Sequence, residues 1–253
     1  MDAFSMKDRN VLVVGGTRGI GRAIALQFAR SGAAVIANYV RDGRAAAKLA
    51  SEVAGEALRL ELVKADVTSE KGIATLTECV SRGGSLHSLV FAAATGVHRP
   101  FEQLTGRHFD FTFALNVKAF LSLVQTFVPH MTAGATIVAL SSEGAAHAMP
   151  QYHLVGASKG ALESLARHLA GELAGRGIRV NVLAPGAVET DVWKALPDAT
   201  QRLAAAAARS PRNRLNTLEE VALAAQFLAS DASAGLIGHT LVVDGGARVM
   251  GAG

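Results

Sequence analysis

The sequence predicts one doubly wound α/β domain, built on a mostly parallel sheet of seven strands. Three observations predict this fold class: short apolar runs alternate with longer helix-patterned stretches, glycines follow the first run at once, and no linker or repeat interrupts the 253 residues. The runs are continuously apolar, as is typical of parallel strands that are covered on both faces. Residues 1–253 are therefore interpreted as a single domain.

The apolar runs place the strands along the chain. Seven ranges are predicted as strands: 11–14, 33–39, 58–64, 88–93, 135–140, 178–183 and 240–243. Residues 20–30 read as the first helix. Farther along, Leu162, Leu165, Leu169 and Leu173 recur at helical spacing and mark one apolar helix face.

The segment 186–217 interrupts this alternation between the sixth strand and the next helix. In a doubly wound sheet, ligands bind beyond the carboxyl ends of the strands, which is where this segment falls. We expect it to be a substrate lid. The alternative is a helical excursion with no role in binding.

Composition argues against several classes of protein. The net charge is +4, and no basic stripe interleaved with aromatic residues indicates nucleic-acid binding. No run of about 18 apolar residues predicts a membrane span, and the polar start does not resemble a secretory signal. Cys79 is the single cysteine, which suits the cytoplasm. His147 and His153 lack spaced metal-ligating partners, so no metal site is predicted.

The glycine-rich stretch 15–21 lies between the first strand and the first helix. Glycines allow the tight turn and the close approach of a pyrophosphate, whose charge the helix N-terminus favours. This context predicts a dinucleotide site. The residues assigned to it are Gly15, Thr17, Arg18, Gly19, Ile20 and Gly21.

The end of the second strand indicates which dinucleotide binds. An NAD site usually has an acidic residue there, whereas this chain has Asn38 and then Arg41. Because Arg18 and Arg41 would attract a 2′-phosphate, we predict NADPH as the cofactor. Asp66 and Val67 follow the third strand and are assigned to the adenine edge, the alternative being a strand-end turn.

These features and several others together resemble the short-chain dehydrogenase/reductase family, over essentially the whole chain. The motifs are the glycine loop, Asp66-Val67, Asn116 in LNVKAF, Ser142 in ALSSEG, Lys159, APGAVETD and VVDGG. The resemblance implies a Rossmann-like domain, a homotetramer, and Lys159 at the nicotinamide ribose. It also implies that Asn116 belongs to the catalytic group. Further cofactor contacts would come from Ala93, Pro185, Gly186 and Val188.

Two positions depart from the family pattern. Phe91-Ala92-Ala93-Ala94 stands where Asn-Asn-Ala-Gly is usual. This departure is interpreted as tolerated structural drift, the alternative being a change in packing beside the adenosine. Val155 stands four residues before Lys159, where the family has its tyrosine, so the usual acid for ketone reduction is missing.

Tyr152 offers a different acid. Its spacing from Lys159, with Arg99-Pro100 nearby, resembles the type III, NADPH-using enoyl-acyl-carrier-protein reductases. If the helix extends this far, three residues displace the phenol by roughly 4.5 Å along its axis. Such a donor suits an enoyl thioester, because charge develops on the carbonyl oxygen, away from the carbon that accepts hydride.

The sequence thus predicts an NADPH-dependent enoyl reductase that acts on a thioester carried by acyl carrier protein. Tyr152 donates to the enolate oxygen, and Lys159 lowers the pKa of the phenol. Ser142 is a further site residue, with a strand-end cap as its alternative role. Two other functions stay open: reduction of another activated alkene or carbonyl in secondary metabolism, and NADPH binding without catalysis.

A basic cluster lies on the predicted lid. Arg209, Arg212 and Arg214 would meet the acidic surface or phosphopantetheine of a carrier protein. The alternative is a solvated face with no partner.

Overall fold

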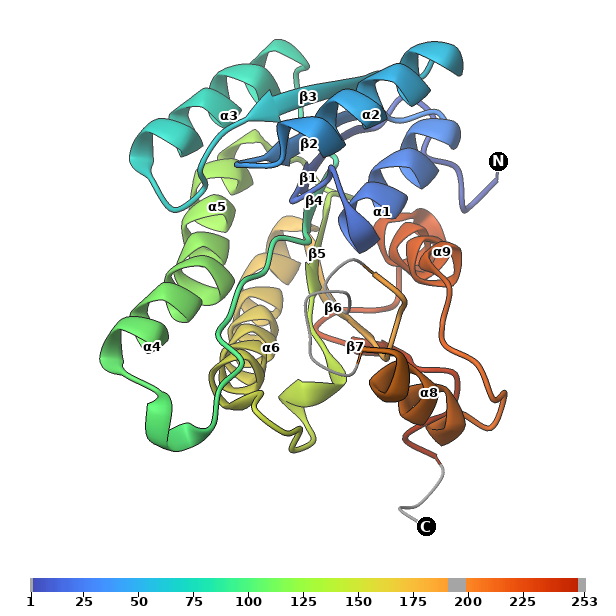
Figure 1. The fold of residues 1–253 in the computed structure, drawn as a ribbon. Helices are drawn as coiled ribbons and strands as arrows, with labels where there is room; N and C mark the ends of the chain where they lie inside the picture. Colours follow the sequence, from blue (N-terminus) through green and yellow to red (C-terminus); the bar gives the residue numbers. More distant parts are fainter. Residues whose placement is uncertain (1, 191–198, 250–253) are drawn as a thin grey trace.

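Seven parallel strands form one sheet in the order β3-β2-β1-β4-β5-β6-β7 in the computed structural model, which describes residues 2–190 and 199–249 (Figure 1). The strands are β1 (Asn10–Val14), β2 (Ala34–Tyr39), β3 (Leu60–Lys64), β4 (Ser88–Phe91), β5 (Thr136–Leu140), β6 (Arg179–Pro185) and β7 (Thr240–Val243). The strand order reverses at β1, which pairs with both β2 and β4. A crevice for ligands is expected at the carboxyl ends of these strands.

Helices cover both faces of the sheet. They are α1 (Gly19–Arg30), α2 (Gly43–Gly55), α3 (Glu70–Arg82), α4 (Gly106–Phe113), α5 (Phe120–Phe127), α6 (His153–Leu173), α8 (Ala199–Arg209) and α9 (Leu218–Ala229). Helices α3, α5 and α6 cover one face, and α1 and α9 cover the other (Figure 1). Their apolar side chains form two separate clusters with the strands. Each face thus has its own apolar core, as the continuous hydrophobic runs of the strands require.

The helical stretch Gly106–His130 is long and apolar enough to cross a membrane by length and composition alone. Its inner face, with Phe120, Leu123, Val124 and Phe127, is buried in the core that α6 also covers. Its hydrophobicity therefore has a role in packing the fold.

The predicted doubly wound fold is confirmed, with small corrections at strand ends. The third strand begins at Leu60 rather than at position 58, because Leu58 N donates to Val53 O at the end of α2. The fourth ends at Phe91, whose ring packs against Phe120 with centroids 5.4 Å apart. Phe91 thus belongs to the apolar core, and its effect on packing beside the adenosine stays a prediction.

Candidate active site

The glycine loop forms a cradle at the carboxyl end of β1. Gly15 and Gly19 have positive φ angles of 79° and 52°, which side chains disfavour. A Cβ at position 15 would lie 2.8 Å from the Cα of Ala93, and one at position 21 would collide with the Gly15 carbonyl. Gly16 N donates to Asn38 O over 2.9 Å. The loop thus presents backbone and a helix N-terminus, which fit a pyrophosphate.

Polar and cationic side chains surround this cradle. Arg18, at the N-cap of α1, and Arg41, after β2, are exposed. The Asp66 carboxylate accepts from both the amide and the hydroxyl of Thr68, which lower its pKa, and Arg41 lowers it further. Asp66 therefore forms a strand-end turn, and its contact with the adenine edge stays a prediction.

The side chain of Asn38 corrects the prediction that it meets the cofactor. It is buried, and its amide donates to the carbonyls of Ala65 at 2.8 Å and Val63 at 3.3 Å. Asn38 therefore joins β2 to the end of β3. Its contribution to the cradle is the carbonyl that holds Gly16.

The chain after β6 passes near the glycine loop. Gly186 N donates to Val243 O over 2.9 Å, and a Cβ at position 186 would lie 2.8 Å from Asp244. Val188 is buried and forms a bridge with Asn216. A Cβ at position 19 would lie 3.8 Å from Cγ2 of Thr190. Pro185, Gly186 and Val188 thus lie on the segment that leads to Thr190, and their cofactor contacts stay a prediction. Residues 191–198 of the predicted lid lie outside the described residues.

Tyr152 lies at the carboxyl end of β5. It is the N-cap of α6, which begins at His153, so the phenol lies just outside the helix rather than on its extended face. Its hydroxyl donates to Ser142 Oγ over 3.3 Å, while its ring packs on Gly144 and lies 5.5 Å from the His98 ring. Ser142 Oγ also accepts from Gly144 N, so it both caps a turn and binds the phenol.

The surroundings of the phenol correct the prediction that Lys159 lowers its pKa. Burial raises the pKa of Tyr152, the hydrogen bond with Ser142 lowers it, and the Glu143 carboxylate raises it. The net shift is upward, and among the described residues the lowering contact comes from Ser142 rather than from Lys159. Tyr152 is therefore fully protonated at neutral pH.

Lys159 is buried in α6 and donates from Nζ to Leu140 O over 2.7 Å. Burial lowers its pKa to about 8, although the Glu163 carboxylate raises it. Ser141 donates to Glu163 over 2.5 Å, which fixes that carboxylate one helical turn beyond the lysine. The ammonium and the phenol thus lie at the same end of β5, because their hydrogen-bond acceptors, Leu140 O and Ser142 Oγ, are two residues apart.

Val155 occupies the position of the usual family tyrosine and is buried against the backbone of Gly96. The loop around Gly96 is held by Asn116, which accepts from Thr95 N and donates to Thr95 O, both at 2.9 Å. Asn116 also donates to Ser158 Oγ over 2.9 Å and is fully buried. Its side chain therefore positions the loop on α6 rather than meeting the reacting atoms, as its catalytic assignment had implied.

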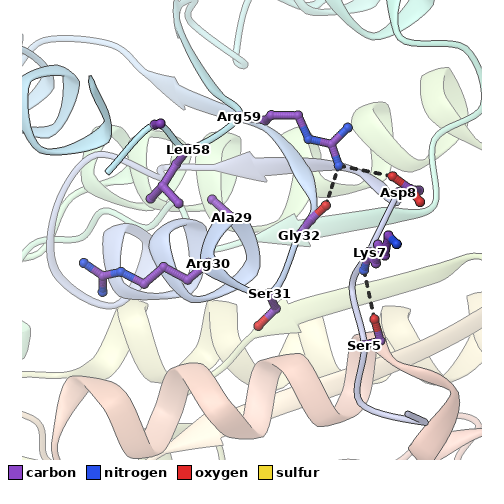
Figure 2. A pocket seen from close by; sticks show the side chains of 10 residues that line it. Ser5, Lys7, Asp8, Ala29, Arg30, Ser31, Gly32, Leu58 and Arg59 are labelled. Atoms are coloured by element: carbon purple, nitrogen blue, oxygen red, sulfur yellow. Dashed lines mark hydrogen bonds and ion pairs between the residues drawn. The ribbon is translucent and has the colours of Figure 1, made fainter. Parts of the chain in front are cut away.

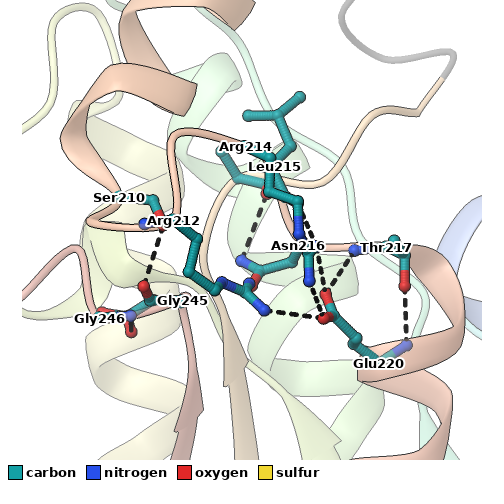
Figure 3. A network of polar contacts seen from close by, with 11 residues as sticks. Ser210, Arg212, Arg214, Leu215, Asn216, Thr217, Glu220, Gly245 and Gly246 are labelled. Atoms are coloured by element: carbon teal, nitrogen blue, oxygen red, sulfur yellow. Dashed lines mark hydrogen bonds and ion pairs between the residues drawn. The ribbon is translucent and has the colours of Figure 1, made fainter.

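The basic cluster after α8 forms bonds within the chain. Arg212 Nη1 and Arg214 Nη2 donate to Glu220 at 2.8 Å and 2.6 Å, and Thr217 completes a capping box with the same carboxylate (Figure 3). These contacts lower the pKa of Glu220 to about 2. Arg209 pairs instead with Glu143. The three arginines thus act first as internal partners, which weakens their prediction as carrier contacts.

A hollow of about 550 Å³ lies far from this site (Figure 2). It is lined by residues that precede β1, β2 and β3, together with the end of α1: Ser5, Lys7, Asp8, Ala29, Arg30, Ser31, Gly32, Ala57, Leu58 and Arg59. It therefore opens at the amino ends of the strands, whereas every assigned polar group above lies at the carboxyl ends.

Three residues near the site were missed by the sequence reasoning. Glu143 and Glu163 approach the phenol and the lysine, and Gly96 accommodates Val155. Glu143 could have been found from its place next to Ser142 in the stretch SSEG. Glu163 could have been found because it lies four residues after Lys159, on the same face of a helix. The contact of Gly96 has no sequence signal.

A parallel sheet with a glycine cradle and a Tyr-Ser-Lys constellation at its carboxyl end defines a nicotinamide-dependent oxidoreductase of the short-chain type. Residues 14–248 match a family model described as Enoyl-(Acyl carrier protein) reductase. The chain belongs to this short-chain dehydrogenase/reductase family and is a reductase of its class.

Relatives that match most of the chain support its assignment to this family. The chain is 35% identical to a 1-cyclohexenylcarbonyl-CoA reductase of Streptomyces collinus, covering 94% of this chain and 86% of that one. It is 31% identical to a hydroxynaphthalene reductase-like protein of Metarhizium majus, covering 96% of each. A gluconate 5-dehydrogenase of Burkholderia cenocepacia, solved with NADP and tartrate, superimposes with a TM-score of 0.90 at 30% identity, covering 98% of each.

Proposed function

We propose that this protein reduces the 2,3 double bond of an enoyl thioester with NADPH. The observation that carries the proposal is the phenol of Tyr152, held by Ser142 at 3.3 Å, while the usual tyrosine position is a buried valine. The relative from Streptomyces collinus supports it, because its named substrate is a thioester with a double bond conjugated to the carbonyl.

Each group has a role in this reaction. The nicotinamide would supply hydride to the β carbon, and charge would then develop on the thioester oxygen. Tyr152, protonated because its pKa is raised, donates a hydrogen bond and then its proton to that oxygen. The enol then takes a proton at the α carbon from solvent and returns its oxygen proton to the phenolate, which completes reduction of the double bond. Ser142 accepts from the phenol and orients it. Lys159 holds the nicotinamide ribose from the floor of the site, where Leu140 O fixes its ammonium.

The preference for NADPH rests on charge. Arg18, at the start of α1, and Arg41, after β2, are both exposed. Neither forms an ion pair within 4.0 Å with another described residue, although Arg41 is near enough to lower the pKa of Asp66. Two available guanidinium groups favour a 2′-phosphate. The structural neighbour that was solved with NADP agrees with this choice.

The partner that delivers the substrate is proposed to be acyl carrier protein, with coenzyme A as the alternative thiol. Initial rates on the crotonyl thioesters of both, at equal concentrations, distinguish them. A higher kcat/KM for the carrier-bound thioester supports the first. A higher kcat/KM for the coenzyme A thioester would instead indicate coenzyme A, which is the thiol in the name of the relative from Streptomyces collinus.

A second candidate function is reduction of a carbonyl. The contact between Ser142 and Tyr152 favours it, because a hydroxyl pair can also polarise a ketone, and a relative is named as hydroxynaphthalene reductase-like.

Loss of NADPH absorbance, measured with enoyl thioesters beside a panel of ketones, tests both functions. Turnover only of enoyl thioesters supports the first candidate, and turnover only of ketones the second. NADPH binding without any turnover would indicate a catalytically silent protein.

A further inference from the structure

An ion pair joins α8 to the turn beside the phenol. Glu143 begins the short 3₁₀ turn Glu143–Ala145, directly after Ser142, and its side chain is 11% exposed. Arg209, the last residue of α8, donates from Nη2 to both carboxylate oxygens, at 3.1 Å and 3.3 Å. A buried carboxylate is costly unless it is paired, so this contact favours α8 in the position that is observed.

The same carboxylate acts on the proposed acid. Glu143 directly follows Ser142, whose Oγ accepts from the Tyr152 hydroxyl at 3.3 Å, and its carboxylate raises the pKa of that phenol. When the phenol gives up its proton it becomes negative, and a carboxylate nearby opposes that change. Pairing with the guanidinium of Arg209 lowers the net negative charge of the turn that holds Ser142. The ion pair therefore affects two things at once, the position of α8 and the charge beside the phenol.

We propose that Arg209 is a positioning residue, which acts through Glu143 to couple the docking of α8 to proton donation by Tyr152. The inference rests on the proposed function, because it needs Tyr152 as the acid. It requires no contact between Arg209 and the substrate. When α8 is docked, Glu143 is paired and opposes proton donation less; when α8 is displaced, the unpaired carboxylate opposes it more.

Three variants separate charge from docking. Arg209→Ala leaves the carboxylate unpaired, and kcat on an enoyl thioester is expected to fall by about tenfold, the effect of one pKa unit on the acid. Glu143→Gln removes the charge that opposes proton donation, so kcat is expected to exceed that of Arg209→Ala. The double variant Glu143→Gln/Arg209→Ala is expected to recover kcat to within about threefold of the parent. In all three, amide hydrogen exchange across α8 (Ala199–Arg209) is expected to be faster.

The control is Arg82→Ala, which removes the same charge and breaks an exposed ion pair with Glu61 far from the site. Its kcat is expected to equal that of the parent. A double variant as slow as Arg209→Ala would overturn the proposal, because the ion pair would then act only by holding α8. Parental kcat in Arg209→Ala would overturn it as well.

The Tyr152→Phe background keeps this test apart from the proposed function. If Arg209 acts through the phenol, Arg209→Ala is expected to cause no further loss of kcat when the hydroxyl is absent. A full additional tenfold loss in that background would refute the coupling. If Tyr152→Phe alone keeps parental turnover, it is the assignment of the acid that fails.

Discussion

Two polar clusters at the carboxyl edge of the sheet have opposite electrostatic character. In the first, Glu220 accepts from Arg212, Arg214 and the Thr217 amide, and its pKa falls to about 2. In the second, burial lowers the pKa of Lys159 to about 8 and raises that of Tyr152. The first environment stabilises charge, whereas the second disfavours it.

These two environments show that the residues that stabilise the fold are distinct from those proposed to react. Glu220 is surrounded by donors in a capping box and by exposed guanidinium groups, so its charge stabilises the start of α9. Within residues 2–190 and 199–249, Lys159 has one bonded acceptor, Leu140 O, although an ammonium can donate three hydrogen bonds. A buried ammonium that makes fewer hydrogen bonds than it can donate lowers the stability of the free protein. Its other N–H groups can then donate to a ligand.

The largest expected effect is on the phenol. Tyr152→Phe keeps the ring on Gly144 and removes only the hydroxyl, so kcat on an enoyl thioester should fall by about 10²–10⁴-fold with NADPH affinity unchanged. Steady-state kinetics and cofactor titration measure both. Tyr39→Phe, at the other tyrosine of the chain, is the control and should keep parental kcat. Near-parental turnover in Tyr152→Phe, with loss in Ser142→Ala, would assign the chemistry to Ser142.

Lys159 should show a conflict between activity and stability. Lys159→Met should weaken NADPH binding and turnover, yet raise the unfolding free energy at pH 7 by about 1–3 kcal/mol, because it removes a buried charge. The folded pKa of about 8 lies below that of an unfolded lysine, so the parent gains stability as pH rises from about 8 to 10.5. Urea unfolding should therefore show a smaller difference in unfolding free energy between variant and parent at pH 10 than at pH 7. An equal difference at both pH values would contradict the cost of burying the ammonium.

Cofactor choice should respond to the two exposed arginines. Arg18→Ala/Arg41→Ala should weaken NADPH by about 10–100-fold, the loss of one or two charged hydrogen bonds, with little change for NADH. Fluorescence titration with each cofactor measures the ratio. Arg44→Ala, an exposed arginine in α2, is the matched control. Equal affinity of the parent for both cofactors would refute the assignment.

The smallest effect is expected in the Glu220 cluster. Glu220→Gln should lower Tm by about 2–4 °C, which corresponds to about 1 kcal/mol in a domain of this size, while kcat is retained. The folded pKa of Glu220 is depressed, so its contribution is present above about pH 4.5 and is lost as pH falls toward 2. Thermal melts at pH 7 and pH 2.5 should show the difference between parent and variant shrinking. A large loss of kcat would place Glu220 in the reactive cluster instead.

Much of the scaffold followed from local sequence patterns, and the site followed in part. Apolar runs and glycines specify the sheet and cradle because their physical reasons lie within a few residues. Asn38 was misassigned because the turn of its side chain toward Ala65 depends on how β3 lies beside β2. The Glu143–Arg209 pair joins residues that are 66 positions apart. The directions of the pKa shifts depend on burial, which no spacing encodes. The tetramer, the cytoplasmic location and the carrier partner stay predictions.

The contact between Gly96 and Val155 has a consequence for engineering. A Cβ at position 96 would collide with Cγ2 of Val155, so the two positions are sterically coupled. The loop has little freedom to move away, because Asn116 holds Thr95 through both its amide and its carbonyl. A variant library that changes the residue at position 155 should therefore vary position 96 together with it.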